Sequence, residues 1–294
     1  MTLFDLPLSF ILAQLTVGLV NGSFYAILSL GLAIIFGMLN IVNFAHGAMY
    51  TMGAFFSWMF LQYVGVGYWP SLLLVPLCVG VIGIIIDRFL LKWIYKLDPV
   101  YGLLLTFGVA LVIESIFREA YGFSGLSYPI PQALSGPVDL GFMFLPMYRG
   151  WVIVAALSIC LLSWLLIEKT QIGAYLRAGT EKPQLTQAFG INVPLIVTLT
   201  YGLGVALAGF AGVLAAPIFQ VSPMMGQNMI IIVFAVVVIG GMGSILGAIL
   251  SGLALGLIEG LARVIYPEAS STVIFLVMVI VLLSRPYGLF GREA

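Results

Sequence analysis

A chain of 294 residues with 62% hydrophobic and only 7% charged residues is not a water-soluble domain, because so few charges cannot cover so much apolar surface. Its mean hydropathy of +1.20 indicates that lipid is its solvent. The 11 basic residues balance the 11 acidic ones, which argues against nucleic acid as a partner. We therefore expect an all-α, polytopic integral membrane protein.

The apolar segments set the number of membrane crossings, since one transmembrane helix needs about 20 apolar residues. The candidate segments are 8–36, 44–61, 69–91, 100–121, 150–168, 193–217, 226–243, 245–262 and 272–285. The nearly continuous run over 226–262 fits two spans, or one span with a re-entrant segment. The prediction is eight to nine transmembrane or re-entrant helices in a single transmembrane domain, 1–294. The first seven residues carry no Lys or Arg, so we expect no cleaved signal peptide.

The basic residues predict the orientation of the chain, because cytoplasmic loops are enriched in Lys and Arg. They cluster in three places: Arg88, Lys92 and Lys96; Lys169, Arg177 and Lys182; and Arg285 with Arg292. Two predicted spans, 100–121 and 150–168, separate the first two clusters. The two clusters therefore lie on the same side, the cytoplasmic one, and the loop 122–148 between these spans lies outside. The C-terminus is then cytoplasmic. Nine crossings put the N-terminus outside and eight put it inside; we expect it outside.

The segment 168–191 is a polar insert between two apolar runs, with five charged residues. We expect two short helices, the second capped by Thr180 and ended by Gly190. Leu185, Ala188 and Phe189 recur at helical spacing and form one apolar face. A helix of about nine residues is marginal in water on its own, so this face docks either on the membrane domain of the same chain or in the groove of a cytoplasmic protein.

Polar residues lie in and beside the first span, where hydrocarbon makes unpaired polar groups costly. They are Asn21, Ser23, Asn40, Asn43 and His46, the last being the only histidine of the chain. Two interpretations stay open at this point. The side chains bond neighbouring helices and the backbone of a helix break, as Asn43 and His46 could do, or they line a pathway for a polar solute.

Two carboxylates within the spans have an arginine four residues later, a spacing that suits an ion pair within one helix. These pairs are Glu114 with Arg118, and Glu259 with Arg263. We expect both pairs to form near span ends and to be structural.

A glycine-rich stretch, 240–247, separates two later spans and contains Gly241 and Gly243. It continues into two ridges of small residues, Gly243, Gly247 and Ser251 on one side and Ala248, Gly252, Gly256 and Gly260 on the other. Such ridges favour close helix packing, although interrupted helices can also flank a transport pathway. No phosphate-binding GxxxxGK[ST] motif and no catalytic signature occurs in the chain. We expect no enzyme activity and no cofactor bound by this chain.

Several motifs occur together and in a fixed order. They are Asn21-Gly22-Ser23-Phe24-Tyr25-Ala26, Gly37-Met38-Leu39, Asn43-Phe44-Ala45-His46-Gly47, Arg177-Ala178, Gly190-Ile191-Asn192, Gly240-Gly241-Met242-Gly243-Ser244 and Arg285-Pro286-Tyr287-Gly288-Leu289-Phe290-Gly291. In this combination the chain resembles the permease subunit of high-affinity branched-chain amino acid ABC importers. The resemblance covers nearly the full chain. It departs from the family pattern at Leu246, where the family often has proline, and at Arg285, where an apolar residue is common.

The resemblance implies a role as a permease that imports branched-chain or related small amino acids across the bacterial inner membrane, driven by ATP. The implied partners are a second, homologous permease, two cytoplasmic ATPases that bind ATP and Mg²⁺, and a periplasmic solute-binding protein. Paralogues of the family carry urea, short amides and aromatic or other small carboxylates, so these solutes stay open. An ion-coupled secondary carrier is the alternative of a different class.

The resemblance and the residue patterns together assign two groups of site residues. The residues expected to couple the permease to its ATPases are Arg177, Ala178, Glu181, Leu185, Ala188, Phe189 and Gly190. The residues expected along the translocation path are Asn21, Ser23, Asn40, Asn43, His46, Gly241 and Gly243. No metal site is expected.

Overall fold

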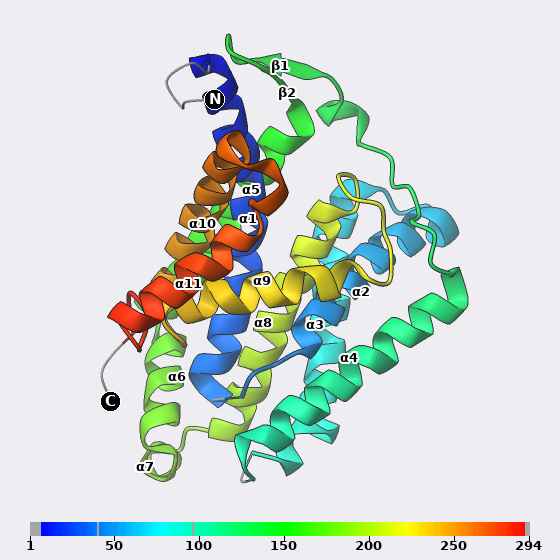
Figure 1. The fold of residues 1–294 in the computed structure, drawn as a ribbon. Helices are drawn as coiled ribbons and strands as arrows, with labels where there is room; N and C mark the ends of the chain where they lie inside the picture. The colour runs from blue at the N-terminus through cyan, green and yellow to red at the C-terminus, as the bar shows by residue number, and fades with distance from the viewer. Residues whose placement is uncertain (1–6, 40, 96, 292–294) are drawn as a thin grey trace. The chain divides into compact units, whose positions relative to one another are not determined.

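A computed structural model describes residues 7–39, 41–95 and 97–291, and most of them are helical (Figure 1). Asn40, Lys96 and Arg292, which the sequence analysis singled out, lie outside the described residues. The helices are α1 (Leu8–Leu39), α2 (Ala45–Met59), α3 (Tyr68–Phe89), α4 (Pro99–Tyr121), α5 (Met147–Lys169), α6 (Gln171–Glu181), α7 (Pro183–Ala188), α8 (Val193–Ala215), α9 (Met225–Gly240), α10 (Ile245–Ile265) and α11 (Thr272–Ser284).

Each of the nine predicted spans corresponds to one of these helices. Six of the helices in the described part of the chain are long and apolar enough to cross a membrane: α1, α3, α4, α5, α8 and α10. The shorter apolar helices α9 and α11 correspond to the predicted spans 226–243 and 272–285. Helix α2 has 15 residues and continues into a π-helical turn, Phe60–Val64. The chain is therefore a polytopic all-α membrane protein, as predicted.

One feature outside the helices was not predicted. The loop 122–148 contains a short antiparallel hairpin of β1 (Pro137–Asp139) and β2 (Phe144–Pro146). Gly141 lies between the two strands with a φ of 80°. A positive φ of this kind costs glycine little, so it suits a tight turn. The hairpin leads directly into α5.

Short side chains set the start of several helices. Asp98 accepts a hydrogen bond of 2.9 Å from the Val100 N–H at the start of α4. Asn192 accepts one of 3.1 Å from the Leu195 N–H at the start of α8. Ser244 accepts one of 3.1 Å from the Gly247 N–H at the start of α10. Each cap satisfies a first-turn donor that has no partner within its helix.

Two compact units divide the chain. The first comprises 1–29, 130–160 and 232–294, and the second comprises 30–129 and 161–231. In the second unit α8 packs against α2 and α3. Its glycines allow this packing, because a Cβ on Gly209 would lie 2.9 Å from the Val79 Cβ and one on Gly53 would lie 2.4 Å from the Gly209 oxygen.

In the first unit the small-residue ridge of α10 packs against the first half of α1. A Cβ on Gly256 would lie 2.3 Å from the Gly22 Cα, and one on Gly18 would lie 2.4 Å from the Gly256 carbonyl oxygen. A Cβ on Gly252 would lie 2.6 Å from the Ala26 nitrogen. The close packing predicted for this ridge is confirmed.

The glycine-rich break between α9 and α10 is held by the C-terminal segment of the same unit. Gly241 and Gly243 have φ values of 98° and 83°, which only glycine adopts readily. The Leu289 and Phe290 N–H groups donate hydrogen bonds of 2.8 and 3.1 Å to the Ile239 and Gly240 carbonyl oxygens. The C-terminal motif 285–291 therefore supplies hydrogen bonds to the carbonyl groups at the end of α9. This is a structural reason for it to occur together with the glycine-rich motif 240–244.

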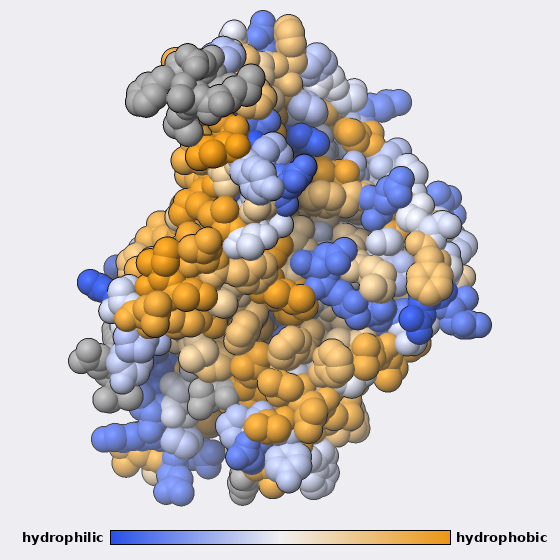
Figure 2. Space-filling model, in the orientation of Figure 1, coloured by the Kyte–Doolittle hydropathy of each residue, from blue (hydrophilic) through white to orange (hydrophobic). Residues whose placement is uncertain are grey.

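The exposed faces of the long helices are mostly apolar, whereas hydrophilic side chains gather on the surface of the polar insert. Apolar side chains such as Leu77 on α3 and Ile116 on α4 are exposed, as expected for a lipid-facing surface. Figure 2 shows the α11 region in orange, whereas hydrophilic side chains gather at α6 and α7 in its lower left. The polar insert thus differs in surface character from the apolar helices.

Candidate functional site

Polar side chains from the connecting segment itself, from α4 and from α8 form hydrogen bonds at the break between α1 and α2 in the second unit. Asn43 Nδ2 donates a hydrogen bond of 3.1 Å to Tyr201 Oη on α8, and Asn43 Oδ1 accepts one of 3.1 Å from the Ala45 N–H. Thr106 Oγ1 on α4 accepts a 3.2 Å bond from the Phe44 N–H and donates one of 3.2 Å to the Val42 oxygen. These bonds satisfy the backbone groups that the break frees.

The remaining residues assigned to the path lie in two different units. Ser23 is fully buried and donates 2.8 Å to the Leu19 oxygen within α1. His46 is fully buried and lies against α1, because a Cβ on Gly31 would come within 2.9 Å of its Cε1. Asn21, Gly241 and Gly243 belong to the first unit, with Ser23, and Asn43 and His46 to the second. Contact of any of them with a solute stays a prediction.

Replacing Asn43 with Leu is expected to destabilise the permease. The change leaves the Ala45 N–H without its acceptor and the Tyr201 hydroxyl without its donor, at about 1–3 kcal/mol for each buried unsatisfied group. Asn43→Leu therefore lowers the melting temperature of the purified protein more than Tyr201→Phe, which removes only the hydroxyl. Wild-type stability with impaired transport would instead assign Asn43 to the solute path.

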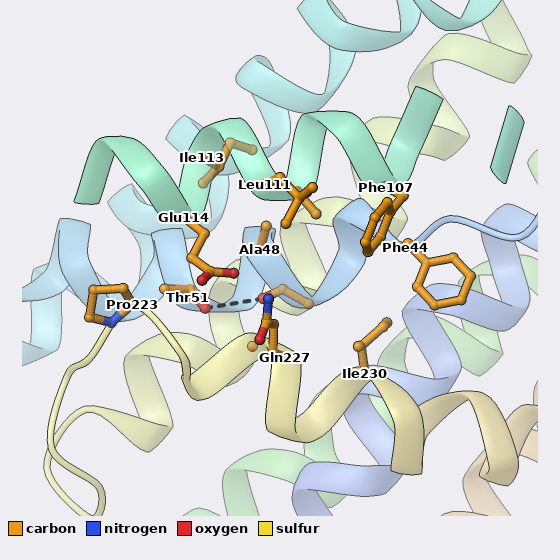
Figure 3. Close-up of a pocket in the computed structure, with 13 residues that line it drawn as sticks. Phe44, Ala48, Thr51, Phe107, Leu111, Ile113, Glu114, Pro223, Gln227 and Ile230 are labelled. Atoms are coloured by element: carbon orange, nitrogen blue, oxygen red, sulfur yellow. Dashed lines mark hydrogen bonds between the residues drawn. The ribbon is translucent and has the colours of Figure 1, made fainter. Parts of the chain in front are cut away.

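A pocket lies between α2, α4 and the start of α9, all within the second unit (Figure 3). Its walls are mostly apolar side chains, among them Phe44, Phe107, Leu111 and Ile230. Figure 3 shows the Glu114 carboxylate pointing from α4 toward Thr51 on α2 and Gln227 on α9. The pocket thus combines a mostly apolar lining with a few polar groups.

Glu114 does not form the ion pair that its spacing predicts. Arg118 instead donates 3.3 Å to Ser115 Oγ and lies 5.6 Å from the centre of the Phe123 ring. Glu114 is only 8% exposed, and no hydrogen bond or ion pair joins it to another described residue. Burying a polar group without a hydrogen-bond partner is costly, so an unpaired Glu114 suggests a functional group.

The second predicted pair does form. Arg263 Nη2 lies 2.5 Å from Glu259 Oε1, and the Tyr25 hydroxyl of α1 donates 2.8 Å to Glu259 Oε2. Glu259 is 3% exposed. Both carboxylate oxygens therefore have partners, which fits the structural role predicted for this residue.

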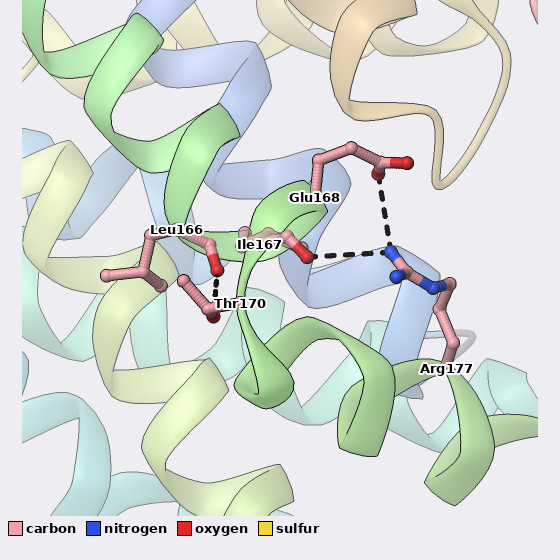
Figure 4. Close-up of polar contacts among 5 residues, drawn as sticks. All are labelled: Leu166, Ile167, Glu168, Thr170 and Arg177. Carbon is pink, nitrogen blue, oxygen red and sulfur yellow. Dashed lines mark hydrogen bonds and ion pairs between the residues drawn. The ribbon is translucent and has the colours of Figure 1, made fainter.

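The polar insert folds as two short helices, α6 and α7, as predicted. Figure 4 shows how Arg177 of α6 reaches Glu168 and Ile167 at the end of α5. Arg177 Nη1 lies 3.3 Å from Glu168 Oε2 and 3.5 Å from the Ile167 carbonyl oxygen, which ties α6 to the end of α5. Thr186 Oγ1 donates 2.9 Å to the Ala178 oxygen and so ties α7 to α6. Gly190 ends the segment with a φ of 83°.

The predicted cap of α7 is wrong. Thr180 lies within α6, where its hydroxyl donates 2.8 Å to the Arg177 oxygen, and α7 begins at Pro183 after Lys182. Proline suits a first helical position because it lacks the N–H that would be unpaired there. Helix α7 is also shorter than predicted, with six residues.

The apolar face of α7 is exposed. Leu185 is 55% exposed and Phe189, at the end of the helix, is 79% exposed, whereas the polar Thr186 is buried. Ala188 is exposed as well, and so are Arg177, Ala178, Glu181 and Gly190. This arrangement reverses the usual burial pattern, since the apolar side chains point away from the chain and the polar one toward it. Such a face is available to another protein.

Comparisons with known proteins agree with the residue patterns. The family described as branched-chain amino acid transport system / permease component matches residues 14–282. The chain is 28% identical over 300 residues to the high-affinity branched-chain amino acid transport system permease protein BraD of Pseudomonas aeruginosa, covering 96% of each chain. It is 28% identical over 301 residues to the permease protein LivH of Escherichia coli K12, again covering 96% of each chain.

A second permease protein of the same E. coli strain is also similar. The chain is 26% identical over 294 residues to LivM, covering 90% of this chain and 67% of LivM. No solved structure gives a significant match.

Proposed function

This chain belongs to the family of permease components of branched-chain amino acid transport systems, and we propose that it forms half of the membrane pathway of an ATP-driven importer for branched-chain or related small amino acids. The observation that carries the ATP-driven part is the exposed apolar face of Leu185, Ala188 and Phe189. Urea, short amides and aromatic or other small carboxylates are the alternative solutes.

The second half of the pathway is a homologous permease. The similarity of this chain to both LivH and LivM of one organism supports pairing between two related but different chains. The periplasmic partner is a solute-binding protein that delivers the solute and largely selects it. The pathway residues of this chain then need to accept only a class of small solutes.

The motor consists of two cytoplasmic ATPases. The sequence has no phosphate-binding loop, so ATP and Mg²⁺ bind to those partners. The α6–α7 segment docks on an ATPase through its apolar face, and the Arg177–Glu168 and Thr186–Ala178 contacts transmit the movement of the docked segment to α5 and α8. The permease then alternates between states that open to opposite sides.

The proposed location is the bacterial inner membrane. The α6–α7 segment and the C-terminus lie in the cytoplasm, and the loop 122–148 with its hairpin lies in the periplasm. The N-terminus lies in the periplasm with nine crossings. The basic residues Arg88, Lys169 and Arg177 support this orientation, since they flank the cytoplasmic ends of their spans.

One observation favours a second candidate, an ion-coupled carrier. Glu114 is a buried carboxylate without a partner among the described residues, and proton- or cation-coupled carriers use such groups. The exposed α7 face has no role in a carrier that works alone, so we prefer the ATP-driven importer.

Proteoliposomes test the proposal. The permease pair is reconstituted with its ATPases, with the binding protein outside and ATP inside, and uptake of labelled leucine, isoleucine and valine is measured. Uptake is expected only when ATP, the ATPases and the binding protein are all present. Uptake by the permease alone under a proton or sodium gradient would establish the carrier instead.

A further inference from the structure

The pocket between α2, α4 and α9 contains a buried carboxyl group without a partner in the described part of the chain. Glu114 is more than nine-tenths buried and points into the pocket. The nearest cation along its helix, Arg118, is engaged by Ser115 and the Phe123 ring. A buried carboxylate is stable in its ionised form only when a cation or several donors compensate it. A cationic group of a bound molecule would supply the partner that the described residues do not.

The same pocket also contains the N-terminal, electropositive end of a helix. Helix α9 begins at Met225, and its first turn, with Gly226 and Gln227, forms one wall. The Gly226 and Gln227 N–H groups donate to no other described residue, whereas the Met225 and Asn228 N–H groups bond to Ser222 and Met224. The first turn of a helix carries unpaired N–H groups and the positive end of the helix dipole, which together bind an anionic group such as a carboxylate.

Close packing sets the position of the start of α9 on α2. A Cβ on Gly226 would lie 2.1 Å from the Gly47 carbonyl oxygen and 2.5 Å from Thr51 Oγ1, so the start of α9 lies directly on α2. Thr51 is itself held, because its hydroxyl donates 3.3 Å to the Gly47 oxygen (Figure 3). The carboxyl group of Glu114 and the first turn of α9 line the same pocket.

The rest of the lining is apolar. Phe44 and Phe107 pack edge to face with ring centres 6.2 Å apart, and Leu111 and Ile230 complete that side. A branched aliphatic side chain gains from burial against such walls. A charged or strongly polar side chain has no partner there.

We propose that this pocket is a solute station that holds a zwitterionic α-amino acid, with its ammonium group at Glu114, its carboxylate at the first turn of α9 and its aliphatic side chain against Phe44, Phe107 and Ile230. The inference rests on the proposed function, because it places the solute of that importer. It adds a positive requirement: the permease recognises the ammonium group and does not only conduct what the binding protein releases. Urea, amides and simple carboxylates lack that group.

The test uses the complete importer in proteoliposomes, with Glu114→Gln compared with Glu119→Gln. Glu119 is an exposed carboxylate on the same helix, so the control removes the same charge outside the pocket. Glu114→Gln is expected to reduce leucine uptake at limiting solute at least tenfold, mainly through a higher KM. Glu119→Gln stays within twofold of the wild type. Glu114→Asp, which keeps the charge on a shorter side chain, retains an intermediate rate.

Stability separates this role from a structural one. Because Glu114 has no partner among the described residues, Glu114→Gln is expected to assemble with the ATPases and to melt at or above the wild-type temperature. Uptake by Glu114→Gln within twofold of the wild type overturns the proposal. So does a failure of both Glu114 variants to assemble, because the carboxylate then supports the fold. Absence of ATP-dependent uptake by the wild-type complex itself indicates instead that the proposed function is wrong.

Discussion

A permease that carries Leu185→Asp and Phe189→Asp is expected to insert into the membrane normally but to lose ATP-driven uptake. Both side chains are exposed in this chain, so the substitutions disturb no internal packing. In an apolar groove each lost anchor costs roughly 2 kcal/mol or more. Since about 1.4 kcal/mol is a factor of ten, docking on the ATPase weakens by on the order of 1,000-fold.

Co-purification of the ATPases with tagged permease and stimulation of their ATPase activity measure this effect. The matched control is Gln171→Asp with Gln187→Asp, which adds the same two charges to exposed positions of α6 and α7 outside the apolar face. The control is expected to behave like the wild type. Normal ATPase stimulation in the Leu185/Phe189 variant would show that α7 is not the docking surface.

Replacing Gly256 with Ala is expected to disrupt the packing of α1 against α10. The new Cβ would lie 2.3 Å from the Gly22 Cα and 2.5 Å from the Gly18 oxygen, whereas ordinary van der Waals contact begins at 3.4 Å. Both are backbone atoms, so the helices themselves must move apart. Overpacking of this kind costs about 1–3 kcal/mol or more, which corresponds to a fall in melting temperature of roughly 2–12 °C.

The control for this substitution is Gly108→Ala on α4. A Cβ on Gly108 has no heavy atom within 4 Å, and alanine favours the helix over glycine. Gly108→Ala therefore melts at or slightly above the wild-type temperature in the same detergent. Equal stability of the two alanine variants would contradict the close α1–α10 contact.

The helices were predictable because the signals that define them are local. Apolar runs near 20 residues long mark the spans, and Gly190 and the 240–244 break coincide with positive-φ glycines or helix ends. The short helices of the insert also follow from local polarity. The misplacement of the α7 cap has a local cause too: Pro183 starts the helix more effectively than Thr180 caps it.

The candidate site was less predictable because its contacts join distant residues. Asn43 and Tyr201 are 158 positions apart, and nothing in either local sequence links them. The sequence spacing also predicted the same ion pair for Glu114 and Glu259, because each has an arginine four residues later. Tyr25 from another helix bonds Glu259 beside Arg263. Glu114 instead points toward Thr51 and Gln227 (Figure 3), and Arg118 bonds Ser115. The sequence offered no signal that Glu114 would lack the partner that Glu259 has, because the spacing to the arginine is the same in both.

Accessibility of position 189 tests the central claim most directly. Phe189→Cys is introduced after both native cysteines, Cys78 and Cys160, are replaced by alanine, and a membrane-impermeant thiol reagent is applied to sealed vesicles of either orientation. We predict labelling only in inside-out vesicles, and protection from labelling when the ATPases are bound. Labelling from the periplasmic face, or labelling unchanged by the ATPases, would contradict the account.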